Sequence, residues 1–176
     1  MPTKHKPLKL QPRISKAQLQ KRIVQLGQQI SRDYRGKDLL CVGVLKGAVP
    51  FFVALTQQIK LDIDQDFVCV ASYHGGRQSS GKIKWVMDLI RPIKGRHVLL
   101  IEDIIDSGLT MQVLLKTLRR RRPASIKIAT LLSKPAARQH KVKPDYCGFE
   151  IGNEFVVGFG LDYFERYRNL DYVATL

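Results

Sequence analysis

The sequence predicts an α/β fold in which a mainly parallel sheet is flanked by helices. Unbroken apolar runs recur along the chain, and such runs are typical of strands covered on both faces. Segments with apolar residues at helical spacing separate these runs. Small and polar residues mark the passages from strand to helix, at the edge where parallel sheets bind ligands. The apolar runs are residues 39–45, 66–73, 98–101 and 125–132.

The length and composition fit one globular domain. The 176 residues are 44% hydrophobic and 26% charged, which is ordinary for a chain that buries a core. The 30 Lys and Arg outnumber the 15 Asp and Glu, and the net charge of +15 favours anionic partners. No stretch reaches the roughly 20 apolar residues of a membrane-spanning helix, and none has the pattern of a secretory signal. The three cysteines lack a C-x-x-C pattern, so we expect free thiols and a cytoplasmic protein.

We divide the chain into a basic N-terminal arm, residues 1–14, and one domain, residues 15–176. The arm is rich in Lys and Arg and has no long apolar core. Ser15 and Gln18 have the spacing of a capping box, which predicts a helix start. Gly36 suits the end of this helix. The apolar stripe of the helix is Leu19, Ile23, Leu26 and Ile30.

A second strand, loop and helix follow at residues 39–59. The strand ends at Lys46 and Gly47, and Pro50 suits the first turn of the helix. Lys46 beside the accessible backbone of Gly47 suits a pyrophosphate contact. The alternative is an ordinary solvated lysine.

The third apolar run, residues 66–73, enters a segment too rich in Gly and Ser to pack, residues 74–82. This composition predicts a flexible loop. Residues 83–87 are expected to return as the second arm of a hairpin. A long loop of this kind is either a linker or a lid over a site.

The central element of the chain is residues 97–110, HVLLIEDIIDSGLT. Its apolar run predicts a strand that ends where Glu102 and Asp103 begin. Both carboxylates would repel a phosphate, so we expect them to accept hydrogen bonds from neutral donors such as sugar hydroxyls. The helix predicted next, residues 111–120, offers unpaired N–H groups and a positive dipole end, which suit a phosphate.

The loop before this helix, residues 106–110, therefore completes a candidate sugar-phosphate site. Ser107, Gly108 and Thr110 are small enough to let an anion approach. The alternative is that Asp106 and Ser107 only cap the helix.

Two later segments bear on the partners of the chain. The arginine run 119–122 suits either a solvated helix end or a nucleic-acid patch, although no aromatic residues are interleaved with it. Lys134 follows the last apolar run, at the carboxyl edge of the sheet where ligands bind.

The string IEDIIDSGLT, residues 101–110, resembles the signature of the phosphoribosyltransferases that bind phosphoribosyl pyrophosphate, in the form typical of the hypoxanthine-guanine enzymes. LKG at 45–47 is similar to the pyrophosphate loop of that family, whose peptide before the lysine can be cis. Ser72 and Tyr73, with the Gly- and Ser-rich segment after them, resemble its catalytic lid. The resemblance covers residues 39–170. It implies a type I phosphoribosyltransferase fold with a lid and a small hood, formed largely by 145–176 with the N-terminal part.

The resemblance also implies an enzyme of purine salvage. The reaction is transfer of 5-phosphoribose from phosphoribosyl pyrophosphate to hypoxanthine, guanine or both, which gives IMP or GMP and pyrophosphate. Asp106 is the implied proton acceptor for the base. The phosphate would lie on Asp106, Ser107, Gly108, Leu109 and Thr110, the ribose on Glu102 and Asp103, and the pyrophosphate on Lys46, Gly47 and Arg168. The purine would contact Lys134, Phe155, Val156 and Asp162.

Magnesium is the implied cofactor, with Glu102, Asp103 and Asp162 as its implied contacts. The family resemblance further implies a homodimer or homotetramer. A different class of function also fits the fold and the charge, namely an RNA-binding regulator. A phosphate-binding module without catalysis is a third. Both alternatives are disfavoured because neither needs Ser72, Tyr73, Asp106 and Lys134 together.

Overall fold

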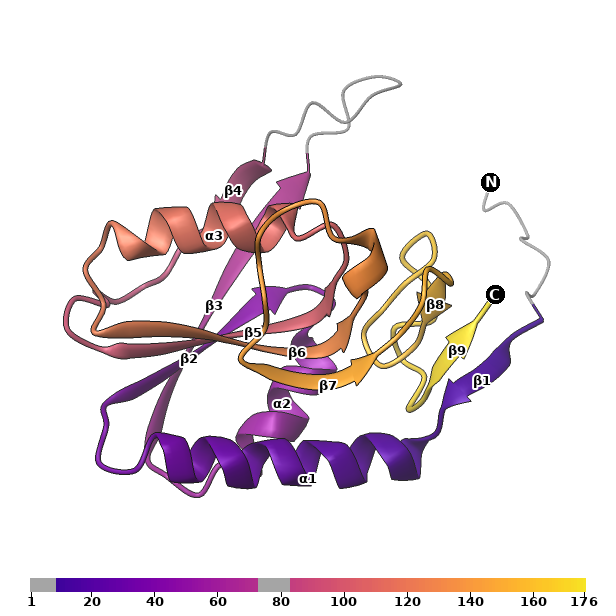
Figure 1. Cartoon of the computed structure of the whole chain (residues 1–176), viewed down its shortest axis with the longest axis horizontal. Coiled ribbons are helices and arrows are strands. Elements are labelled where there is room, and N and C mark those ends of the chain that lie inside the picture. The colour runs from indigo at the N-terminus through magenta and orange to yellow at the C-terminus, as the bar shows by residue number, and fades with distance from the viewer. Residues whose placement is uncertain (1–8, 73–82) are drawn as a thin grey trace.

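A computed structural model of the chain describes residues 9–72 and 83–176 (Figure 1). Its main sheet has six strands in the order β4-β3-β2-β5-β6-β7. All neighbouring pairs are parallel except β3 and β4. The predicted α/β class and mainly parallel sheet are therefore confirmed. The strands are β2 (Leu39–Leu45), β3 (Ile63–Ser72), β4 (Ile83–Met87), β5 (His97–Ile105), β6 (Ser125–Ser133) and β7 (Tyr146–Glu150).

Helices cover both faces of this sheet. Helices α1 (Lys16–Asp33) and α2 (Val49–Thr56) lie on one face, and α3 (Leu109–Arg119) lies on the other (Figure 1). The strands serve both cores because successive side chains point to opposite faces. Leu99 packs in the cluster that contains the α1 and α2 side chains, and its neighbour Leu100 packs in the cluster of α3. This double burial explains the unbroken apolar runs.

Helix α1 begins with the predicted capping box. Ser15 Oγ accepts a hydrogen bond from the Gln18 backbone N–H at 3.3 Å, and the Gln18 side chain accepts one from the Ser15 N–H at 2.8 Å. The helix ends at Asp33, earlier than Gly36, which lies in the following turn with a φ of +72°. All four residues of the predicted apolar stripe are buried.

The hairpin after α2 is as predicted, with β4 antiparallel to β3. Strand β3 is longer than expected, because it begins at Ile63 and pairs along the whole length of β2. Ser72 is the last residue of β3. The predicted lid and its Tyr73 lie outside the described residues.

A small second sheet joins the two ends of the chain. It has the order β1-β9-β8 and is antiparallel, with β1 (Gln11–Ile14), β8 (Val156–Val157) and β9 (Val173–Thr175). The end of the basic arm is thus a strand. By contrast, β7 is not part of this small sheet, although the family resemblance implied a hood formed largely by residues 145–176. It pairs in parallel with β6 and forms an edge of the main sheet.

Two further expectations concern the described residues as a whole. Cys41, Cys69 and Cys147 are all free thiols, as predicted. Within residues 9–72 and 83–176, no helix is long and apolar enough to cross a membrane.

Candidate active site

The central strand β5 is longer than its apolar run. Glu102 pairs with Thr130 of β6, and the ladder continues to Ile105, which pairs with Ser133. Glu102 and Asp103 therefore lie within the strand, whereas the sequence placed them after it. The strand extends because β6 offers backbone partners up to Ser133 and because Ile105 is buried again beyond the acids.

A cavity of about 250 Å³ lies where β5 passes into α3. The N-cap of α3 is Gly108, with a φ of +86°, a conformation that residues other than glycine rarely adopt. Ser107 Oγ accepts a long hydrogen bond, 3.4 Å, from the Leu109 N–H. The N-cap is therefore neither Asp106 nor Ser107, the residues that the sequence suggested, although Ser107 still accepts a hydrogen bond from the first turn of α3. The cavity is lined by Glu102 and by every residue from Ile104 to Met111.

Arg138 supports the loop 106–108 through hydrogen bonds to its backbone, a role that the sequence did not reveal. Its guanidinium donates hydrogen bonds to the backbone oxygens of Asp106 at 2.9 Å and Ile105 at 3.1 Å, and also to that of Val142. The Gln139 N–H donates to the backbone oxygen of Ser107 at 3.0 Å. Arg138 lies in a polar stretch with no periodic pattern, so nothing in the sequence distinguished it from a solvated arginine.

A second cavity, of about 240 Å³, adjoins the first, because Ile104 and Asp106 line both. Lys134 is only 8% exposed, and among the described residues nothing forms an ion pair or side-chain hydrogen bond with its ammonium. Phe155 is 53% exposed, and its ring meets the Tyr163 ring edge-on at 5.8 Å between centroids. The lining residues are Asp103, Ile104, Asp106, Lys134, Phe155, Val156, Leu161 and Asp162.

The loop after β2 packs closely against β5. The peptide between Leu45 and Lys46 is cis. A Cβ added to Gly47 would lie 1.7 Å from Asp103 Oδ2, and one added to Gly160 would lie 1.9 Å from the Gly47 oxygen. Only glycine fits at either position. Three segments distant in sequence are brought together here.

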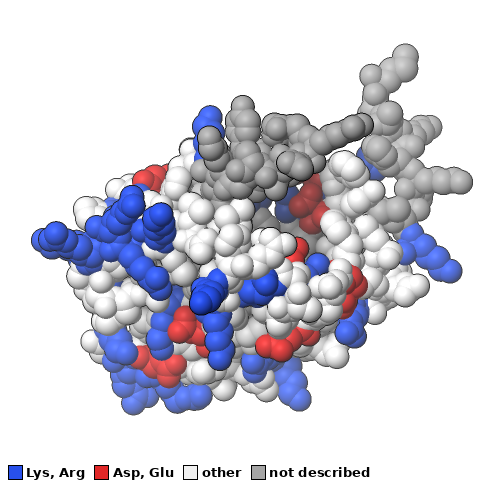
Figure 2. All heavy atoms as spheres, turned by 45° about the horizontal axis from the view of Figure 1, so that its top comes forward, with Lys and Arg blue, Asp and Glu red and all other residues white. Residues whose placement is uncertain are grey.

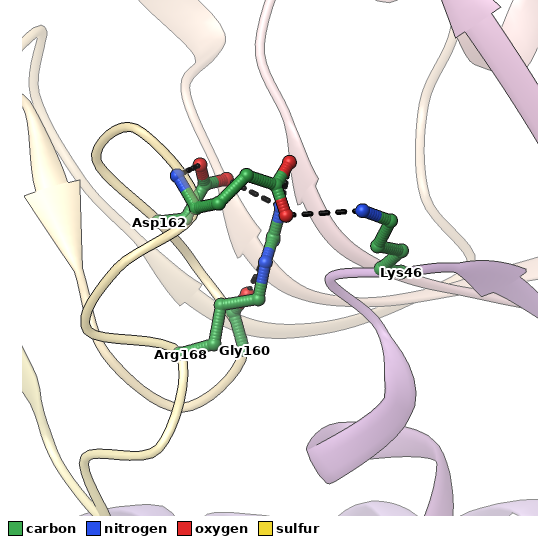
Figure 3. A network of polar contacts seen from close by, with 5 residues as sticks. Lys46, Gly160, Asp162 and Arg168 are labelled. Atoms are coloured by element: carbon green, nitrogen blue, oxygen red, sulfur yellow. Dashed lines mark hydrogen bonds and ion pairs between the residues drawn. The ribbon is translucent and has the colours of Figure 1, made fainter. Parts of the chain in front are cut away.

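Four charged side chains form a network beside these glycines (Figure 3). Lys46 Nζ lies 3.0 Å from Glu165 Oε2. Arg168 Nη2 lies 2.9 Å from Asp162 Oδ1 and 3.3 Å from Glu165 Oε1, and Arg168 Nη1 donates to the Gly160 oxygen at 2.8 Å. Lys46, Asp162 and Arg168 were predicted site residues, and Glu165 was not. An acid on an exposed loop carries no sequence signal of this role.

The two acids of β5 lie in an environment that opposes their charge. Burial, with repulsion from Asp103, raises the pKa of Glu102 well above its ordinary value. Burial also raises the pKa of Asp103, and the hydrogen bond that its carboxylate accepts from the Ile104 N–H opposes this shift. Glu102 Oε2 is buried and has no hydrogen-bond partner among the described residues. Such an oxygen is a ready acceptor for a ligand hydroxyl.

The parallel sheet thus carries one cavity at the start of α3 and a second cavity beside it, which Lys134 and three aspartates line. The family model described as "Phosphoribosyl transferase domain" matches residues 15–163. The chain therefore belongs to the phosphoribosyltransferase family. The expected type I phosphoribosyltransferase fold is confirmed.

Relatives of known name narrow this assignment to the hypoxanthine-guanine branch. The chain is 48% identical over 163 residues to a hypoxanthine-guanine phosphoribosyltransferase of Lactococcus lactis, across 93% of this chain and 88% of that protein. It is 47% identical over 163 residues to the protein of that name from Bacillus subtilis, across 93% and 91%. A crystal structure of a hypoxanthine phosphoribosyltransferase from Staphylococcus aureus superposes with a TM-score of 0.91 at 42% identity, across 94% and 90% of the two chains.

Proposed function

We propose that the protein transfers 5-phosphoribose from phosphoribosyl pyrophosphate to hypoxanthine and guanine, which yields IMP or GMP and pyrophosphate in purine salvage. The observation that carries this proposal is the pair of adjoining cavities with Asp106 on their shared wall. One cavity suits a sugar phosphate and the other suits a flat base with an acceptor atom. A nucleotide joins these two chemical groups.

The first cavity would hold the phosphoribosyl group. The N–H groups at the start of α3 and the positive end of its dipole would bind the 5-phosphate over Asp106, Ser107, Gly108, Leu109 and Thr110. Glu102 and Asp103 would accept hydrogen bonds from the ribose hydroxyls. The partnerless oxygen of Glu102 supports this assignment, because a hydroxyl would satisfy it.

The second cavity would hold the purine. Lys134 lines this cavity and is only 8% exposed, and the 6-oxo group of hypoxanthine or guanine would supply an acceptor for its ammonium. Phe155 would stack on the ring, and the backbone of Val156 and the side chain of Asp162 would contact its edge. Adenine has an amino group at C6, which is itself a donor, so Lys134 would disfavour it.

Asp106 would accept the proton that the imidazole ring of the base loses as it attacks the ribose. Its position in the walls of both cavities supports this role, because it would then lie between the base and the sugar phosphate. Lys46, Gly47 and Arg168 would contact the departing pyrophosphate. Ser72 and Tyr73 would belong to a lid that shields the reacting sugar from water.

The residues present fit a magnesium ion held jointly with substrate. Among the described residues, no three His, Cys, Asp or Glu side chains form a group that could hold a metal. Magnesium commonly binds through one or two carboxylates together with substrate phosphates, so no cage of this kind is required. Asp162, beside the pyrophosphate cations, and the pair Glu102 and Asp103 are the carboxylates that would serve. When bound, the ion would neutralise charge on the pyrophosphate.

The decisive experiment follows the nucleotide formed from phosphoribosyl pyrophosphate, magnesium chloride and one purine at a time. We expect IMP from hypoxanthine, GMP from guanine and no AMP from adenine. The absence of product with both oxopurines would refute the proposed activity. Equal use of adenine would refute the role of Lys134. Size-exclusion chromatography of the same sample tests the homodimer or homotetramer that the family resemblance implies, and the cytoplasm is its proposed location.

A further inference from the structure

Glu165 bridges the two cations that are proposed to bind the pyrophosphate. Its Oε2 lies 3.0 Å from Lys46 Nζ, and its Oε1 lies 3.3 Å from Arg168 Nη2. The two cations come from distant parts of the chain, the loop after β2 and the turn before β9 (Figure 3). One carboxylate, with one oxygen on each cation, thus makes the contacts that two phosphoryl oxygens would make.

The contacts of Glu165 are of the kind that a multivalent anion can displace. The side chains of Lys46 and Glu165 are 67% and 65% exposed, and exposed ion pairs contribute little to stability. Arg168 and its other partner, Asp162, are 27% and 30% exposed. Arg168 also donates to the Gly160 oxygen. Loss of Glu165 from the network would therefore leave Arg168 held in place.

The backbone directs Glu165 to this position. Its N–H donates to Asp162 Oδ2 at 2.9 Å, within a turn closed by two hydrogen bonds of 3.1 Å between Tyr163 and Arg166. Phe164 and Glu165 have φ values of +50° and +61°. These are uncommon for residues other than glycine, and such conformations concentrate at functional sites.

We propose that Glu165 is an internal competitor of the pyrophosphate group. Phosphoribosyl pyrophosphate must displace its carboxylate from Lys46 and Arg168, and the carboxylate returns as pyrophosphate leaves. The inference rests on the proposed function, because it takes these two cations as the pyrophosphate contacts. Glu165 is then a residue that tunes affinity for one part of the substrate and promotes release of one product.

The test is the binding of magnesium pyrophosphate and of IMP to the full chain and to Glu165→Gln, measured by isothermal titration calorimetry. The substitution removes the competing charge at nearly constant shape. We expect pyrophosphate to bind about two- to fivefold more tightly to the variant, the range expected from the loss of weak, exposed ion pairs. IMP carries no pyrophosphate, so its affinity should not change. In steady-state kinetics, the KM for phosphoribosyl pyrophosphate should fall by the same factor.

Asp171→Asn is the matched control. Asp171 is an exposed acid near the same end of the chain, but its ion pair is with Lys16. Its loss changes the net charge equally without touching Lys46 or Arg168, so pyrophosphate affinity should stay as in the unmodified chain. Circular dichroism melts of both variants check that they fold.

Each remaining outcome overturns the proposal. Weaker pyrophosphate binding in Glu165→Gln would mean that Glu165 helps to hold the anion. Equal tightening of pyrophosphate and IMP would indicate a general field effect, and unchanged affinities would mean no competition. If the unmodified chain forms no nucleotide, the proposed function fails. If it forms nucleotide but Glu165→Gln lacks the selective gain, only the competitor role fails.

Discussion

Glu102 lies in the middle of the sheet, yet one of its carboxylate oxygens is buried without a partner among the described residues. Burial and the neighbouring Asp103 raise the pKa of Glu102 well above its ordinary value. The folded chain therefore binds the Glu102 proton more tightly than the unfolded chain. Stability from this group is present below the unfolded pKa and is lost as pH rises through that value toward the folded pKa.

Replacement of this acid should separate stability from activity. At pH 8, Glu102→Gln should melt a few degrees above the unmodified chain, because the penalty of a buried charge is gone. At pH 4 the difference should vanish, because the acid is then protonated in both states. The value of kcat/KM for phosphoribosyl pyrophosphate should fall about tenfold or more, because an amide replaces the carboxyl group that is proposed to accept a hydrogen bond from a ribose hydroxyl.

Thermal melts at the two pH values and initial-rate kinetics measure these effects. Glu154→Gln is the control, because the Glu154 side chain is 28% exposed and its ion pair is with Arg13 and not with a predicted site residue. A lower melting temperature for Glu102→Gln at pH 8 would contradict the prediction.

At the scale of elements, sequence patterns predicted the helices and strands whose formation depends on residues close together in the sequence. The capping box of α1, the hairpin arm β4 and the buried strand β2 follow from spacing, turn residues and apolar runs. The length of β5 does not, because its last residues pair with a strand distant in sequence. Strand β7 has no continuous apolar run that could have revealed it, because it lies at an edge of the main sheet. Its residues 147–149 are only half-buried.

The candidate site residues also divide into those that a local sequence pattern marks and those that act through remote contacts. The loop 106–110 was recognisable as a candidate site because it combines small residues with a helix start, and a cavity does lie there. Arg138 and Glu165 were not, because each acts through contacts with remote segments. No local pattern specifies such contacts.

The strand-to-helix loop should depend on Arg138 as a support. Arg138→Ala removes its hydrogen bonds to the backbone of Ile105 and Asp106 and leaves those oxygens without this donor. We expect the KM for phosphoribosyl pyrophosphate to rise about tenfold or more and the free energy of unfolding to fall by about 1–3 kcal/mol. Initial rates and urea denaturation measure the two quantities.

Lys141→Ala is the matched control for this substitution. Lys141 is an exposed cation of the same segment. Its loss should change the free energy of unfolding by no more than about 0.5 kcal/mol. The KM for phosphoribosyl pyrophosphate should change by no more than the factor that corresponds to this energy. If Arg138→Ala raised the KM no more than Lys141→Ala does, the supporting role would be refuted.

At the scale of the whole molecule, the net charge of +15 favours the approach of anions. Lys and Arg side chains are spread over the face shown in Figure 2, with Asp and Glu between them. The relatives described above carry the names of enzymes, and nothing in the comparisons favours the RNA-binding alternative. Attraction of a polyanionic small substrate is then the simplest use of the charge.

This net charge predicts opposite salt responses for the two substrates. The Debye length shortens from about 30 Å at 0.01 M salt to about 10 Å at 0.1 M, so distant charges stop attracting phosphoribosyl pyrophosphate. We expect its KM to rise several-fold over this range, whereas the KM for uncharged hypoxanthine should not change. Initial rates in potassium acetate measure both values, because sulfate and phosphate would compete at the anion site. Equal responses of the two KM values would show that the surface charge does not guide substrate binding, since a field acts only on the charged partner.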